Sequence, residues 1–461
     1  MTCEEALQFW FGRVNYEQRS PRASDLKLDR MRCLLDLLGD PLPSMRVVHV
    51  AGSKGKGSTS AMIASVLRQA GYRTGLFTSP HLTNIKERIQ VDGQPVGKEE
   101  LAALMADVRP SVEKMDRWRP SSAVGVTFFE IATALGLLHF QRRRADIVVL
   151  EVGLGGRFDS TNVCKPLVSV ITSISFDHTQ QLGNTLGQIA MEKAGIVKPG
   201  RPVVSGVDVA EAREVIEAIC RQRGAPLREV GVDFRYEYTP GTLLPAAHCS
   251  LPTPAKMQVS TSRQRWPQME IALLGRHQAA NAAVVVATVE ELRTLGLTIE
   301  DQAVASGLKA VQWPARLEVM RANPLVVLDC AHNVSSAQAL VDTLAESFQC
   351  KSPGNGNGRQ GRRYLIFAAS GDKDIEGMFQ VLGPYFDHAY LTRFTTNPRS
   401  APPPQLLQMW QRACSQPATA HTEPEAAWEA ARSLGTTNDL ICVAGSVFLA
   451  GELRPLIMSC S

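Results

Sequence analysis

The chain has 461 residues, of which 44% are hydrophobic, 20% charged and 6% aromatic. At about 150 residues per domain, this length predicts two to four domains, and the apolar content excludes a mostly disordered chain. The formal net charge is only +4, from 49 lysines and arginines against 45 acidic residues. That balance argues against a nucleic-acid-binding protein, which usually carries a larger basic excess.

The N-terminal residues and the cysteines indicate the compartment. The first residues are acidic where a secretory signal would be basic, and the most apolar stretch, 131–140, is too short to span a membrane. We expect that stretch to be a buried helix. The ten cysteines form no CxxC pair and fit neither a zinc ribbon nor a disulfide scaffold. These features predict a cytoplasmic protein with no membrane partner.

Short apolar runs alternate with helical patterns in the first half of the chain. A helix is expected at 58–70, and strands are expected at 46–50, 74–77, 147–150, 168–174 and 202–205. This alternation predicts a doubly wound, mainly parallel sheet covered by helices on both faces, that is, an α/β fold.

A second α/β pattern follows, with helices expected at 336–348 and 424–433 and strands at 325–328, 364–369, 388–391 and 440–444. Pro314 lies between the two patterns and disfavours a continuous helix or central strand there. We therefore place a domain boundary near residue 315, which gives domains 1–315 and 316–461. The polar stretches 252–268 and 351–363 are expected to be surface loops.

A glycine-rich segment, GSKGKGST at 52–59, joins the first expected strand to the first helix. Glycines allow backbone N–H groups to face an anion, the helix N-terminus favours negative charge, and Lys56 can supply a positive charge. Gly57 separates Lys56 from Ser58, so the segment does not match the P-loop pattern GxxxxGK[ST]. We favour phosphate binding over the alternative, a flexible turn.

Polar residues also occur at the ends of later strands, where ligands collect in doubly wound folds. Ser79, Glu151 and His178 could together bind a magnesium ion beside a nucleotide. Taken singly, each has a structural alternative: a helix cap, an ion-pair partner or a half-buried histidine. The segment EVGLGGRFDSTN at 151–162 could likewise approach a ligand closely, or form a tight turn capped by Asp159 and Thr161.

An ordered set of motifs makes the chain resemble the Mur ligase superfamily, specifically the dihydrofolate synthase/folylpolyglutamate synthase family. The resemblance extends from about residue 5 to about residue 455. The motifs are GSKGKGST (52–59), TSPHL (78–82), TFFE (127–130), EVGLGGRFDSTN (151–162), DH (177–178), EKAGI (192–196), GRHQAANAA (275–283), WPAR (313–316), DCAHN (329–333), NPR (397–399) and GSVFLAGE (445–452).

The resemblance implies a P-loop-type ATPase domain, a smaller C-terminal Rossmann-like α/β domain, and a role for each matching residue. ATP contacts would be Gly52, Ser53, Lys54, Gly55, Lys56, Gly57, Ser58, Asn281, Arg316 and Asp329. Magnesium ligands, for two ions, would be Ser79, Glu151, His178 and Lys193, the last as an N6-carboxylated lysine. The pterin side would be lined by Thr127, Phe128, Phe129, Glu130, Arg157, Phe158, Asp159 and Ser160. An unmodified Lys193 paired with Glu192 or another acid is the alternative at that position.

The activity that the resemblance implies is ATP-dependent addition of L-glutamate to dihydropteroate or to the glutamate tail of tetrahydrofolates, through an acyl phosphate. Lys56 would stabilise the transferring phosphoryl group, and His332 or carboxylated Lys193 would accept the proton of the amine. Closure of the two domains about 313–316 would exclude water. The expected partners are the small molecules ATP, folate or dihydropteroate, and L-glutamate. The protein is expected to be a monomer.

Three positions depart from the family pattern. Ser53-Lys54 replaces Thr-Asn in the loop, Ala315 replaces a common glycine, and Cys330 occupies a variable position. Two other functions stay open: a cell-wall Mur ligase acting on a UDP-linked precursor, and a P-loop switch protein. The motifs TSPHL and EVGLGGRFD favour the folate branch over the first, and DCAHN and NPR in a second domain argue against the second.

Overall fold

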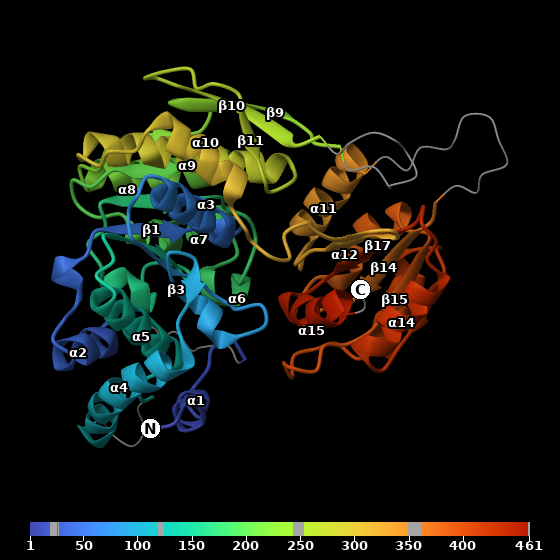
Figure 1. Cartoon of the computed structure of the whole chain (residues 1–461), viewed down its shortest axis with the longest axis horizontal. Coiled ribbons are helices and arrows are strands. Elements are labelled where there is room, and N and C mark those ends of the chain that lie inside the picture. The colour runs from blue at the N-terminus through green and yellow to red at the C-terminus, as the bar shows by residue number, and fades with distance from the viewer. Residues whose placement is uncertain (19–24, 26, 119–123, 243–252, 349–360, 460–461) are drawn as a thin grey trace. The chain divides into compact units, whose positions relative to one another are not determined.

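The computed structural model describes residues 1–18, 25, 27–118, 124–242, 253–348 and 361–459. The chain divides into two compact units, which are described separately (Figure 1). Unit 1 comprises Met1–Glu237, Gln258–Met269 and Ala280–Val311. Unit 2 comprises Tyr238–Met257, Glu270–Ala279 and Gln312–Ser461.

An eight-stranded sheet forms the centre of unit 1, with strand order β4-β3-β2-β5-β1-β6-β7-β8. Its strands are β1 (Val47–Ala51), β2 (Thr74–Phe77), β3 (Ile89–Val91), β4 (Gln94–Pro95), β5 (Ile147–Glu151), β6 (Val168–Ile171), β7 (Val203–Ser205) and β8 (Leu227–Glu229). All neighbours pair in parallel except β2–β3 and β3–β4. β1 lies between β5 and β6, so the carboxyl ends of these three strands are adjacent, as at a ligand-binding edge.

Helices cover this sheet and bury it in two main apolar clusters. The cluster around α4 and α5 includes Trp10, Phe128 and Phe140, and the cluster around α7 and α8 includes Ile189 and Ile216. The helices are α1 (Cys3–Phe11), α2 (Asp29–Leu37), α3 (Lys56–Gln69), α4 (Lys98–Trp118), α5 (Phe128–Arg142), α6 (Thr179–Leu182), α7 (Leu186–Lys193), α8 (Ala210–Gln222), α9 (Arg276–Thr294) and α10 (Asp301–Ala310). Residues 131–140 lie in α5 and are buried throughout, which confirms the expected buried helix.

A three-stranded sheet of order β11-β10-β9 corrects one expectation from the sequence. Its strands are β9 (Phe234–Thr239), β10 (Ala255–Thr261) and β11 (Met269–Ile271). The stretch 252–268, expected to be a surface loop, contains β10 and the fully buried Trp266, whose Nε1 donates to Glu290 (2.9 Å). Apolar residues in β10 alternate with polar ones, and this period of two was hidden in a polar composition. Of the other polar stretch, 351–360 lies outside the described residues.

A six-stranded sheet of order β12-β13-β17-β14-β15-β16 forms the centre of unit 2, and only β12–β13 is antiparallel. The strands are β12 (Glu318–Ala322), β13 (Leu325–Leu328), β14 (Arg363–Phe367), β15 (His388–Leu391), β16 (Ala418–Ala420) and β17 (Leu440–Ala444). The helices are α11 (Val334–Ser347), α12 (Ile375–Leu382), α13 (Pro403–Ala413), α14 (Pro424–Leu434) and α15 (Val447–Ser459). The predicted fold class, two mainly parallel α/β sheets, is therefore confirmed.

Short 3₁₀ turns complete the described elements. They are η2 (Leu42–Ser44), η3 (Ile85–Arg88), η4 (Ser160–Val163), η5 (Ala194–Ile196) and η6 (Gly383–Tyr385). Among the residues that the structure describes, no helix is both long and apolar enough to cross a membrane.

Candidate active site

The glycine-rich loop connects β1 to α3 at the carboxyl edge of the unit 1 sheet. Gly52 has φ of +149° and Gly55, the residue before α3, has φ of +81°, conformations that other residues rarely adopt. A Cβ on Gly52 would lie 2.0 Å from Thr172 Oγ1, and one on Gly55 would lie 2.3 Å from Asn281 Oδ1. Glycine is therefore required at both positions, and Asn281 of α9 lies directly against the loop.

Two lysines converge on one carbonyl group of this loop. Lys56 Nζ donates to Gly52 O at 3.1 Å, and Lys193 Nζ, from the end of α7, donates to the same oxygen at 2.9 Å. Lys193 is only 3% exposed, and burial, followed by the charge of Lys56, holds its pKa well below the usual 10.5. Glu192 lies 3.9 Å from Arg157, while the Lys193 amine bonds the Gly52 carbonyl oxygen.

The segment after β6 anchors the loop from the other side. Ser53 N donates to Ser173 O at 2.7 Å, and Ser53 Oγ donates to Ser175 O at 2.9 Å. Lys54 Nζ forms an ion pair with Asp177 Oδ2 at 2.8 Å. The loop is therefore held by backbone carbonyl groups and the Asp177 side chain of the segment 173–177, to which the sequence interpretation gave no role apart from the DH pair.

Ser79 and Glu151 meet at the adjacent strand ends. Glu151, the last residue of β5, is 4% exposed, and its Oε2 accepts a hydrogen bond from Ser79 N at 3.2 Å. His178 lies in the next loop with φ of +51°, and its Nε2 is 3.8 Å from Asp177 Oδ1. Among the described residues, no group of three or more histidine, cysteine, aspartate or glutamate side chains is placed to hold a metal ion.

The segment 151–162 packs against the EKAGI turn. Arg157 N donates to Glu192 O at 2.8 Å, and a Cβ on Gly195 would lie 2.4 Å from the Cα of Arg157. Gly156 lies close to the backbone at the end of α7, since a Cβ on it would lie 2.8 Å from Lys193 O. These glycines permit backbone-to-backbone contact, which fixes Lys193 relative to the loop.

Asp159 is buried and organises this segment. Its Oδ2 accepts from Gly153 N (3.0 Å) and Leu154 N (2.9 Å), and its Oδ1 accepts from Thr161 N (3.0 Å) and Thr161 Oγ1 (2.5 Å). The predicted cap at Asp159 is confirmed, because it caps η4. Ser160 Oγ is 2.6 Å from Thr133 Oγ1, whereas Arg157 and Phe158 remain largely exposed, with the guanidinium over the ring.

The TFFE segment starts α5. Thr127 and Glu130 form a capping box, and Arg30 Nε lies 3.1 Å from Glu130 Oε1. Phe128 is buried and stacks on Trp10, with ring centroids 5.2 Å apart. The Phe129 ring lies against Gly153, where a Cβ would be 2.5 Å away, so TFFE and EVGLGGRFD are in contact.

His49, inside β1, is a residue that sequence reasoning missed. It is fully buried, and its Nε2 is 2.8 Å from Thr161 Oγ1. Since that hydroxyl gives its proton to Asp159, His49 Nε2 is the donor. Burial lowers the pKa of His49 to about 3. The available signal was one polar residue in the apolar strand sequence VVHVA.

Within unit 2, Asp329 directly follows β13, and its carboxylate accepts hydrogen bonds from backbone N–H groups on both sides of that strand in the sequence. Its Oδ2 accepts from Leu317 N (2.8 Å) and its Oδ1 from Ala331 N (2.7 Å), while burial raises its pKa against the opposing charge of Arg316. Ala315 has φ of +55°, which explains why glycine suits that position. His332 Nδ1 is 2.8 Å from Cys330 O, and since a carbonyl oxygen only accepts, this nitrogen donates the hydrogen bond.

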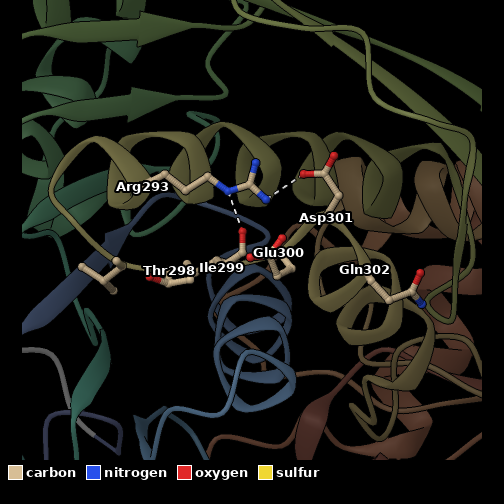
Figure 2. A pocket seen from close by; sticks show the side chains of 7 residues that line it. Arg293, Thr298, Ile299, Glu300, Asp301 and Gln302 are labelled. Atoms are coloured by element: carbon tan, nitrogen blue, oxygen red, sulfur yellow. Dashed lines mark hydrogen bonds and ion pairs between the residues drawn. The ribbon is translucent and has the colours of Figure 1, made fainter.

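Two hollows lie outside the motif residues of unit 1. Figure 2 shows the first, about 520 Å³, between α9 and α10, where Arg293 donates to Ile299 O and Asp301 Oδ1 (both 2.7 Å). None of the predicted site residues lines it. The second, about 720 Å³, lies within unit 2 and is lined by Trp313, Arg316 and Arg454, among others.

Comparisons with known proteins agree along the chain. A model of the Mur ligase middle domain matches residues 50–289, and one of the Mur ligase glutamate ligase domain matches residues 315–447. The dihydrofolate synthase/folylpolyglutamate synthase of Bacillus subtilis (strain 168) is 35% identical over 435 residues, covering 93% of this chain and 94% of that relative. The folylpolyglutamate synthase of Lacticaseibacillus casei is 32% identical over 439 residues, covering 93% and 94%.

Solved structures are similar over the whole fold. The Mycobacterium tuberculosis folylpolyglutamate synthase complexed with ADP and AMPPCP has a TM-score of 0.86 at 30% identity, covering 99% of this chain and 98% of that one. Escherichia coli FolC in complex with DHPP and ADP has a TM-score of 0.82 at 28% identity, covering 100% and 98%. The chain belongs to the Mur ligase family, in the branch of the dihydrofolate synthases and folylpolyglutamate synthases. The resemblance inferred from the motifs is therefore confirmed.

Proposed function

We propose that the chain is an ATP-dependent amide ligase that joins L-glutamate to dihydropteroate, to the glutamate tail of tetrahydrofolates, or to both, and releases ADP and phosphate. The observation that carries this proposal is the loop at 52–58, where Lys56 and Lys193 converge on Gly52 O beside Ser79 and Glu151. Positive charge, glycine backbone and a buried carboxylate at one strand edge suit phosphoryl transfer.

The nucleotide contacts that we propose are the loop residues 52–58, with Lys54 contributing only its backbone, together with Asn281, Arg316 and Asp329. We assign ATP and folate binding to residues 1–315, and we assign 316–461 as the glutamate-ligase domain. The protein acts on these small molecules as a cytoplasmic monomer, without a nucleic-acid or membrane partner.

The reaction requires that a carboxylate become an electrophile. Its oxygen attacks the γ-phosphorus of ATP, the bond from that phosphorus to the ADP oxygen breaks, and an acyl phosphate forms. The α-amine of glutamate then attacks the acyl carbon, loses a proton, and expels phosphate. Lys56 stabilises the charge on the transferring phosphoryl group.

The donor set at the strand ends suits magnesium. Ser79 and Glu151 offer hydroxyl and carboxylate oxygens, which magnesium prefers, and the hydrogen bond from Ser79 N to Glu151 brings the two residues together. Ser79, Glu151 and His178 would hold one ion, and Lys193 would contribute to a second once carboxylated. Bound magnesium would neutralise part of the phosphate charge.

Carboxylation of Lys193 is chemically reasonable at this position. Attack on carbon dioxide requires a neutral amine, and burial of Lys193 lowers its pKa and so favours that form. The resulting carbamate would be an anion beside Lys56. His332, whose Nδ1 bonds the Cys330 carbonyl oxygen, is the second group that we propose; the Nε2 of its neutral ring would accept the amine proton.

The pterin side of the site is proposed to be Thr127–Glu130 and 157–160. Contact between the Phe129 ring and Gly153 supports a shared surface for these two segments. Since Phe128 and Asp159 are buried, they act by supporting the surface, whereas Phe129 and Phe158 retain exposed ring area that a flat heterocycle can stack on.

The test is one ligase assay with three acceptors: dihydropteroate, a monoglutamyl tetrahydrofolate, and a UDP-muramyl precursor. We expect glutamate-dependent phosphate release with one or both folates and none with the UDP-linked compound. Lys56→Ala should abolish turnover with the fold intact by circular dichroism. Turnover only with the UDP-linked acceptor would instead assign the chain to cell-wall synthesis, and nucleotide hydrolysis without any amide product would indicate a switch protein.

A further inference from the structure

Lys54 is joined to the segment after β6 by its backbone. Lys54 N donates to Ser173 Oγ at 3.2 Å, and Lys54 O accepts from Thr172 Oγ1 at 2.5 Å and from Ser173 Oγ at 3.1 Å. Residue 54 is thus held in place whatever its side chain does, and a substitution there tests the side chain without releasing the loop.

The side chain of Lys54 turns to an acid. Its Nζ lies 2.8 Å from Asp177 Oδ2, with 23% of the Lys54 side chain and 8% of the Asp177 side chain exposed. Asp177 Oδ1 accepts from His178 N at 3.1 Å. The ion pair therefore connects the phosphate loop to the segment that presents His178.

The other two lysines around the loop behave differently. Lys56 and Lys193 both direct Nζ to Gly52 O, whereas Lys54 directs its Nζ to Asp177 Oδ2. The charge of Asp177 also acts on Lys193, but Lys54 is in hydrogen-bond contact with that carboxylate. A carboxylate beside a polyphosphate site would repel the nucleotide unless its charge is compensated. Lys54 is placed to provide this compensation.

We propose that Lys54 is a positioning residue that acts on nucleotide binding through Asp177: its ammonium offsets the charge of Asp177 in the ion pair and does not contact phosphate. This inference rests on the proposed ATP-dependent function. It replaces the phosphate contact that the sequence alone assigned to Lys54.

A double-mutant cycle distinguishes compensation of Asp177 by Lys54 from direct contact of Lys54 with phosphate. The measured quantity is the affinity for ADP in the absence of divalent metal. Lys54→Met removes the cation that lies 2.8 Å from Asp177 Oδ2. The site then carries one more net negative charge, which should weaken ADP binding by roughly tenfold. Asp177→Asn alone should keep the affinity of the wild type or improve it. In the double variant, with no charge left to compensate, affinity should return to within about twofold of wild type.

Lys54→Arg is the matched control, because it keeps the charge and should bind ADP as the wild type does. Amide hydrogen exchange over 172–178 should rise in Lys54→Met and in Asp177→Asn and stay unchanged in Lys54→Arg. A weakened Lys54→Met that Asp177→Asn does not relieve, or an unchanged Lys54→Met, overturns the proposal. If wild-type protein binds no ADP at all, the proposed function fails instead.

Discussion

Lys193 shows at the scale of one residue how burial sets chemistry. Its amine lies among Lys54, Lys56 and the carbonyl of Gly52, and desolvation together with the neighbouring charge of Lys56 lowers its pKa. Position 193 followed from the EKAGI motif, but the lowering of the amine pKa by Lys56 depends on a neighbour 137 positions away in the chain. Sequence spacing does not provide that information.

Protein equilibrated with ¹³C-bicarbonate should give one carbamate carbon signal that is absent from Lys193→Ala. Burial lowers the pKa of this amine and so favours the neutral form that attacks carbon dioxide, and Lys56 would stabilise the product anion. Lys198→Arg is the matched control, because Lys198 is also partly buried with a lowered pKa yet binds the Asn162 carbonyl oxygen. The signal should persist in that variant. Absence of the carbamate carbon signal from the wild-type protein under these conditions would refute the modification.

His49 should make folding stability depend on pH. Its pKa is about 3 in the fold, against 6.5 as the reference value. Between these values the unfolded chain binds a proton that the folded chain does not, so stability is greatest above pH 6.5 and falls as pH decreases toward 3. At about 1.4 kcal/mol per pKa unit, the loss reaches a few kcal/mol.

The measurement is urea unfolding at pH 7.5 and pH 5, for wild type and His49→Gln. We expect the variant to be less stable at pH 7.5, because its bond to Thr161 is weakened, but to lose less on acidification. His81 and His277, both with pKa lowered to about 4 by burial, contribute equally to both proteins and cancel in the comparison. Equal losses in the two proteins would exclude His49 as a contributor.

At the scale of elements, glycines decide which segments can touch. Gly307 of α10 packs on α3, where a Cβ would lie 2.5 Å from the Cα of Val66, and Ser65 Oγ donates to Gly307 O at 2.8 Å. This contact holds the helix that begins at the phosphate loop. Gly156 and Gly195 are another example. These glycines, rather than the charged residues beside them, allow the segment 151–162 and the EKAGI turn to come into contact.

Gly307→Ala should lower the free energy of unfolding of unit 1 by about 1–3 kcal/mol, because the added methyl group meets backbone that cannot move aside cheaply. Gly371→Ala, at an exposed position with its nearest foreign atom 3.9 Å away, should change stability little. Urea unfolding followed by tryptophan fluorescence and circular dichroism measures both. A loss no larger for Gly307→Ala than for Gly371→Ala would show that α10 can shift.

Most strands and helices agreed with the sequence pattern. The strands 74–77, 325–328, 388–391 and 440–444 were predicted with the observed bounds. The error at 252–268 arose because charged and polar residues occupy the exposed positions of β10, while its alternate residues and Trp266 are buried. Composition averaged over a window conceals this alternation.

At the scale of the whole molecule, the chain is two α/β units whose chain segments are interleaved near residues 237–280. The sequence placed a single boundary near residue 315. The return of the chain from 258–269 and 280–311 to unit 1 depends on contacts such as Trp266 with Glu290, which pair residues far from any motif.

ADP at 100 times its dissociation constant should stabilise the folded protein by about 2.7 kcal/mol, since the ligand binds the folded chain alone. For a chain of this size we expect a rise in melting temperature of about 3 °C, measured by differential scanning fluorimetry. Lys56→Met should show a much smaller shift, and guanosine diphosphate serves as a nucleotide control. No shift in the wild type would contradict nucleotide binding.

The sequence by itself determined the fold class, the family and the positions of the motif residues, because strand and helix patterns and short motifs are local. Only the tertiary structure decided how those residues pair: Lys54 with Asp177, Lys193 with Gly52 O, and His49 with Thr161. These contacts join residues more than 100 positions apart. They exist because β1, β5 and β6 are adjacent in the sheet, and strand order is a property of packing.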